Sequence, residues 1–135
     1  MNRDDFHKLT QERLKDVQAL LKRERYSGAY YLCGYIIECA LKACIAKRTK
    51  EFDFPPRPAM TREIYVHDPV KLVKSAGLTG AVDEFCMQDG EFEKNWALTQ
   101  KWNEESRYES RTELEARELY DAITNKKHGV LQWII

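Results

Sequence analysis

Two arginine-containing segments have side chains that could act on a phosphate. The first is Arg107-Tyr108, at the end of a polar stretch. A guanidinium can hold a phosphate through two parallel hydrogen bonds, and a neighbouring tyrosine can stack on a base or donate a hydrogen bond. Arg107 and Tyr108 are therefore candidate ligand-binding residues. A structural alternative is an ion pair of Arg107 with Glu104, Glu105 or Glu38 that holds the start of the last helix.

The second segment contains Arg62 and His67, which are separated by four residues. An arginine that clamps a phosphate and a histidine that acts as acid or base are the minimum equipment for RNA cleavage without a metal. His67 is therefore a candidate catalytic residue. It also has a structural explanation, because it directly precedes Asp68-Pro69, which is typical of a helix start.

Metal and cofactor sites are not indicated. The three histidines, His7, His67 and His128, are far apart in the sequence, and no cysteine pair has zinc spacing. The sequence contains no glycine-rich phosphate loop, no G-x-S-x-G and no H-E-x-x-H. We therefore expect no metal and no cofactor. The cysteines are expected to be small buried hydrophobic residues in a reducing cytosol: Cys33, Cys39, Cys44 and Cys86.

The composition predicts one folded domain over residues 1–135. Basic and acidic residues number 22 each, so the formal net charge is zero, which excludes a globally basic nucleic-acid coat and an acidic disordered tail. Hydrophobic residues make up 43% and charged residues 33%, a balance typical of a helix-rich globule. Six glycines and four prolines are too few for a turn-dense β-sandwich or barrel.

Two long helices are expected to position the candidate residues. Apolar residues at helical spacing predict the first helix over residues 3–24, and the sequence AYYLCGYIIECALKACIA predicts the second over 28–48. Between them lies Tyr26-Ser27-Gly28. The two helices are expected to form a long antiparallel hairpin.

The second helix is apolar on nearly all sides, and we expect a second subunit to cover part of it. Gly28, Gly34 and Ala40 would allow close helix approach, so the sequence predicts a homodimer through the helix 28–48. Glu38 and Lys42 interrupt its apolar surface as a favourable i,i+4 pair. A pair of charges in the middle argues against a membrane span, and the protein is expected to be cytoplasmic.

The rest of the chain predicts short helices. Residues 49–67 hold three prolines within a PxxP pattern and read as an irregular connector. Ser110 and Glu113 suggest a capping box that opens a last helix through Thr124. Whether that helix continues past Gly129 is left open. The remaining helices are expected over residues 70–76, 79–87 and 91–102, with a polar break at 103–108. The predicted fold class is an all-α, up-down bundle of four or five helices.

With these parts assembled, the chain resembles the HEPN family of small helical-bundle proteins. Glu38-Cys-Ala-Leu-Lys42 in the apolar helix is similar to the family's E-x-x-L-K stretch. The segment His67-Asp-Pro-Val-Lys-Leu72 is similar to its H-D-L-x-x-L helix start, and Trp102 through Tyr108 to the W-x-x-x-x-R-Y of one branch. The resemblance spans about residues 9–125, and the order and spacing of the motifs carry it.

The resemblance implies a dimer with a cleft at its interface. Many family members are metal-independent ribonucleases, often toxins of a toxin–antitoxin pair with a minimal nucleotidyltransferase as partner. These members carry an arginine, then four to six intervening residues, and then a histidine. Arg107 matches the arginine, but the positions for the histidine hold Thr112, Glu113 and Leu114.

Three hypotheses follow. The first is a non-catalytic dimer that binds a nucleotide, an RNA or a partner protein through Arg107, Tyr108, Glu38 and Lys42. The second is a divergent metal-independent endoribonuclease, in which Arg107 holds the phosphate and His67 or Tyr108 replaces the missing base. The third is a structural network of Arg107 and Glu38 without any ligand.

Overall fold

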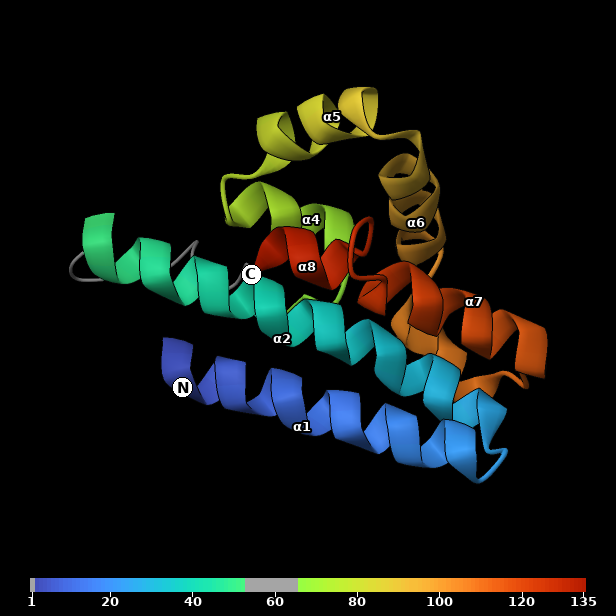
Figure 1. Ribbon diagram of the computed structural model, residues 1–135. Coiled ribbons are helices and arrows are strands. Elements are labelled where there is room, and N and C mark those ends of the chain that lie inside the picture. The colour runs from blue at the N-terminus through green and yellow to red at the C-terminus, as the bar shows by residue number, and fades with distance from the viewer. Residues whose placement is uncertain (1, 53–65) are drawn as a thin grey trace.

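The all-helical class is confirmed by a computed structural model of the chain, which describes residues 2–52 and 66–135. Helices α1 (Arg3–Lys22) and α2 (Tyr26–Phe52) lie side by side and antiparallel (Figure 1). A capping box of Asn2 and Asp5 opens α1. The hairpin turn places Glu24 at φ 60°, and the Arg25 N–H donates to the Leu20 carbonyl at 2.8 Å.

The remaining helices cover one side of this hairpin. Asp68 caps α4, and Thr112 caps α7. The expected polar break at residues 103–108 is a short 3-10 helix, η1, between α6 and α7. The chain does not continue α7 past Gly129 but starts a separate short helix there. The bounds are α4 (Pro69–Ser75), α5 (Thr79–Gln88), α6 (Gly90–Gln100), η1 (Glu104–Tyr108), α7 (Glu113–Thr124) and α8 (Val130–Ile134).

Three predicted boundaries were wrong. The segment Tyr26-Ser27-Gly28, expected to separate the two long helices, belongs to the start of α2. Helix α2 runs to Phe52, four residues beyond the expected end, and the prolines at 55, 56 and 58 lie outside the described residues. The last capping box is formed by Thr112 and Glu115 rather than by Ser110 and Glu113. Both pairs fit the S/T-x-x-E pattern. A tertiary hydrogen bond decides between them, since the Arg111 N–H donates to Ser27 Oγ at 2.8 Å before the helix begins.

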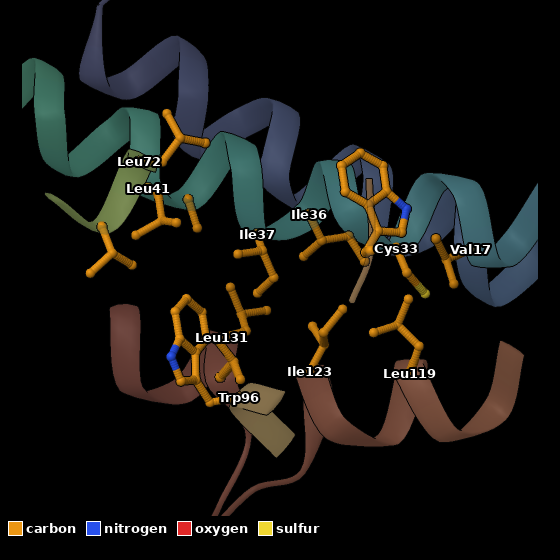
Figure 2. Close-up of a cluster of buried hydrophobic side chains, with 14 of the residues drawn as sticks. Val17, Cys33, Ile36, Ile37, Leu41, Leu72, Trp96, Leu119, Ile123 and Leu131 are labelled. Carbon is orange, nitrogen blue, oxygen red and sulfur yellow. The ribbon is translucent and has the colours of Figure 1, made fainter. Parts of the chain in front are cut away.

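Helix α2 is the centre of the core. It packs against α1, α4, η1, α7 and α8. Ile36 and Ile37 are fully buried within the single chain, and Figure 2 shows them facing side chains of α7 and α8. Leu119 and Ile123 of α7 complete this part of the core. One chain therefore covers the apolar helix that we expected a second subunit to cover, and the homodimer stays a prediction.

Helix α2 is also the one helix in the described part of the chain that is long and apolar enough to cross a membrane. The window Tyr26–Arg48 has a mean hydropathy of 1.3, and 67% of it is buried inside the protein. Burial of this extent is what a core helix shows. The buried Glu38 lies near its middle.

Gly34 gives α2 a role that the sequence did not indicate. The Trp102 side chain lies against the helix backbone at this point, and its Nε1 donates to the Tyr31 carbonyl at 3.1 Å. A Cβ atom at Gly34 would lie 2.0 Å from Trp102 Cε2. Gly34 was expected to let a helix of a second subunit approach closely. The space beside it is instead filled by the Trp102 indole of the same chain, which is 2% exposed.

We predict opposite outcomes for alanine at the two glycines of this helix. Gly34→Ala forces the buried Trp102 ring to move and lowers the free energy of unfolding by about 1–3 kcal/mol. Gly28→Ala is the matched control, because its Cβ would meet Leu20 Cδ1 at an ordinary 3.6 Å. Its free energy of unfolding should stay unchanged or rise by no more than about 0.5 kcal/mol. Urea denaturation followed by circular dichroism measures both, and equal effects would contradict the packing described.

Candidate functional site

A buried carboxylate connects α2 to the start of α4. Glu38 is only 6% exposed. Its Oε2 lies 3.5 Å from Lys42 Nζ, and its Oε1 forms a short hydrogen bond with Nδ1 of His67. The structure thus brings together three of the predicted site residues: Glu38, Lys42 and His67.

Local structure holds His67 in place. The next residue, Asp68, is the N-cap of α4, and its Oδ1 accepts from the backbone N–H groups of Val70 at 2.9 Å and Lys71 at 3.4 Å. Pro69 occupies the first helical position, where its missing N–H costs nothing. The helix start and the histidine are therefore fixed as one unit.

The other face of His67 meets η1. Its Nε2 lies 3.3 Å from Glu104 Oε2, within ion-pair distance. Asn103 caps η1 by accepting from the Glu105 N–H at 2.9 Å, and the preceding Trp102 is anchored to α2. Glu104 is thereby presented to His67 by a tightly held backbone.

A cavity of about 540 Å³ opens beside the side chains of His67 and Glu104. Its polar lining offers amide, ammonium, imidazole and carboxylate groups. Glu38 is absent from the lining among the residues described, so it supports His67 from behind. The lining residues are Val66, His67, Asp68, Lys71, Gln100, Trp102, Asn103 and Glu104.

A cluster of aromatic rings packs against His67 and Trp102, which line the cavity. Tyr35 contacts His67 edge-on with centroids 5.8 Å apart, and Trp102 at 5.5 Å. The Tyr31 and Tyr35 hydroxyls lie 3.0 Å apart. Burial raises the pKa of the Tyr35 hydroxyl, and the hydrogen bond with Tyr31 and the charge of Glu38 raise it further. Tyr35 therefore stays a neutral hydrogen-bonding group.

Arg107 and Tyr108 lie at the opposite end of η1 from Glu104. Neither is among the residues that line the cavity. The guanidinium of Arg107 lies over the Tyr108 ring, 4.7 Å from its centroid, and Tyr108 is 73% exposed. The neighbouring Tyr108 raises the pKa of Arg107, which stays a cation. Within the described ranges Arg107 forms no ion pair, which argues against the structural alternative of a pairing with Glu104, Glu105 or Glu38.

Several residues of the site were not predicted from the sequence. Glu104 was considered only as a partner for Arg107, and Lys71, Gln100 and Asn103 were not considered at all. A weak signal existed for Lys71, because it lies in the first turn of the helix that Asp68 caps. Arg62, the proposed partner of His67, lies outside the residues that the structure describes.

The expected burial of the cysteines is confirmed for Cys33 and Cys39, whereas Cys44 and Cys86 are only half-buried. The four cysteines are free, and burial raises the pKa of Cys33 to about 12 and of Cys39 to about 11. Thiols with pKa values raised in this way stay protonated at neutral pH. Over residues 2–52 and 66–135, no group of three histidine, cysteine or carboxylate side chains could hold a metal ion.

A second histidine–carboxylate pair has a structural role. His128 Nδ1 lies 2.6 Å from Asp89 Oδ2, and that hydrogen bond lowers the pKa of the carboxyl. Asp89 also caps α6, and Asn95 donates to the His128 carbonyl at 2.9 Å. The pair ties the chain before α8 to α6 and does not line the cavity.

Comparisons with protein-family models, with curated proteins and with solved structures find no match to this chain. The site must therefore be interpreted from its own geometry.

We predict that the Glu38–Lys42 pair behaves as a buried ion pair. Lys42→Met leaves Glu38 without its cation and lowers the free energy of unfolding by about 3 kcal/mol. In the double variant Glu38→Met with Lys42→Met the loss should be smaller, because no charge is left unpaired in the interior. Urea denaturation of both variants measures the coupling. A loss in the double variant that equals or exceeds the loss in Lys42→Met would contradict it.

Proposed function

We propose that this protein is a HEPN-like helical domain that binds a nucleotide or a single-stranded RNA at the cavity beside His67. The observation that carries the proposal is a histidine fixed between Glu38 and Glu104 at the wall of a polar cavity. A buried charge such as that of Glu38 costs free energy, and paired charges beside a cavity are candidates for a functional site.

The size and lining of the cavity support a ligand of nucleotide dimensions. Its volume of about 540 Å³ lies in the range of small-molecule sites. The Asn103 side chain uses its oxygen as a helix cap, which leaves its amide nitrogen available to a ligand. Lys71 supplies a cation for a phosphate, and Gln100 can pair with a base edge.

Arg107 and Tyr108 extend this surface along η1. An exposed tyrosine ring with a guanidinium over it is a platform on which a base can stack and a phosphate can be held. Arg107 has no carboxylate partner among the described residues, so its charge is available to a phosphate. A single-stranded RNA bound along η1 would contact Arg107 and then the cavity.

A divergent metal-independent ribonuclease is the second candidate function. The geometry that favours it is the bond from His67 to Glu38, because catalytic bases are oriented by a carboxylate in this way. In this version Arg107 stabilises the charge on the phosphate and His67 accepts the proton of the attacking hydroxyl. Tyr108 is less suited, because it points its exposed ring toward Arg107 and lies outside the cavity lining.

We predict that Arg107→Ala weakens binding of a fluorescently labelled single-stranded RNA about tenfold or more, as expected for loss of a charge-assisted contact. It should also reduce the slope of log affinity against log salt by about one phosphate contact. The matched control is Arg117→Ala, which removes an exposed arginine paired with Glu113 on α7. Fluorescence anisotropy measures all three proteins. Unchanged affinity in Arg107→Ala would contradict its role.

The same RNA, end-labelled and incubated with chelator, separates the two functions. Cleavage by the wild type that is abolished in Arg107→Ala or His67→Ala would make the protein a ribonuclease. Binding without cleavage supports the non-catalytic module. A wild-type protein that neither binds nor cleaves the RNA would overturn both.

A further inference from the structure

Both ring nitrogens of His67 face carboxylates. Nδ1 bonds to Glu38 on the core side, and Nε2 lies 3.3 Å from Glu104 Oε2 beside the cavity. An ionised carboxylate accepts hydrogen bonds and cannot donate them. A neutral imidazole has one N–H and one lone pair, so it can satisfy only one of these two neighbours. The imidazolium ring, which carries a proton on each nitrogen, satisfies both.

The surrounding charges also favour a positive ring. Within the described part of the chain, the charged groups at the ring and in the cavity beside it are Glu38 and Lys42 of α2, Asp68 and Lys71 at the start of α4, and Glu104 of η1. Three carboxylates thus face two ammonium groups, and a positive charge on His67 balances them. Tyr35, which contacts the ring edge-on, stays neutral.

The two carboxylates differ in their access to water. The Glu38 side chain is 7% exposed and the Glu104 side chain 45%. Water can replace the ring as a donor at Glu104 but not at Glu38, so a ring with a single proton keeps it on Nδ1. Nε2 then turns a lone pair toward Glu104 Oε2, and two acceptors this close repel each other. Loss of one proton therefore breaks the link to η1 and leaves the link to α2 intact.

We propose that His67 is a pH-sensitive link: at neutral pH its imidazolium ring joins η1 to α2 and α4, and at alkaline pH the loss of the Nε2 proton releases Glu104. Because η1 also carries Arg107 and Tyr108, the switch acts on the backbone that presents them. The link is a property of the protein alone and does not rest on the proposed function. It bears on the second candidate function, because an imidazolium has no lone pair with which to accept the proton of an attacking hydroxyl.

The first test counts the protons on the ring. Long-range ¹H–¹⁵N correlation spectra distinguish an imidazolium from a neutral ring, and the His67→Gln spectrum assigns the His67 signals. We expect the two-proton form to predominate at pH 7.5, where a histidine of ordinary pKa holds it in about one molecule in ten. At more alkaline pH the proton that remains should be on Nδ1. A ring with a single proton at pH 7.5, or a neutral ring protonated on Nε2, would overturn the proposal.

The second test measures what the link to Glu104 contributes at two pH values. Glu104→Gln should lower the folding equilibrium constant about two- to fivefold at pH 6.5, as expected for a partly exposed ion pair. Because folding favours the charged ring, this contribution is complete at pH 6.5 and is lost as the pH rises through deprotonation of His67. At pH 9 the substitution should leave the constant unchanged or raise it. Urea denaturation of wild type and variant at the same pH cancels the titration of all other groups that the two share.

Glu105→Gln is the matched control, because Glu105 is the exposed neighbour of Glu104 on η1. Its effect should be the same at both pH values. The effect of Glu104→Gln should likewise lose its pH dependence when His67→Gln is already present. An effect of Glu104→Gln that is equal at pH 6.5 and pH 9, or a pH dependence that survives in the His67→Gln background, would overturn the proposal. If the His67→Gln protein does not fold, the comparison of Glu104→Gln with Glu105→Gln decides.

Discussion

The buried charge of Glu38 is the constraint on which the site depends. A carboxylate taken out of water costs several kcal/mol unless cations and hydrogen-bond donors surround it, about as much as half of a small domain's stability. Lys42, one turn along α2, supplies the cation, and His67 supplies the donor. Through His67 the same charge ties the start of α4 to α2, and the contact of His67 with Glu104 extends this link to η1. Three elements distant in sequence are thus held by one group.

Local patterns predicted the helices well because local physics determines them. Asp68-Pro69 marked a helix start, and the apolar spacing marked α1 and α2, since capping and periodicity involve neighbours in the sequence. The pair of Glu38 and Lys42 followed from i,i+4 spacing alone. Predictions failed where a tertiary contact chose between local options. Ser110 and Thr112 both satisfied the capping pattern, and a hydrogen bond to Ser27 decided.

The site was predicted in part for the same reason. Its members were found as separate candidates, and the sequence held no sign that His67 lies beside Glu38, because the two are 29 positions apart in the chain. The sequence left Arg107 either as a phosphate ligand or as a partner of nearby glutamates. In the structure it is His67 that meets Glu38 and Glu104, and Arg107 lies over Tyr108. The packing of η1 against α2 places Glu104 next to His67. That packing depends on the contact of the Trp102 ring with Gly34.

The packing of Trp102 against Gly34 of α2 also limits how such a site can evolve. The indole of Trp102 belongs to the hydrophobic core and also lines the cavity. A substitution that moves this ring therefore lowers the free energy of unfolding. Lys71, Gln100 and Asn103 lie at the solvent side and carry little of the core. Ligand specificity would therefore diverge through substitutions at these three exposed residues, which change the free energy of unfolding little, while Trp102 stays the same. A family built on this scaffold could exchange ligands without redesigning its fold.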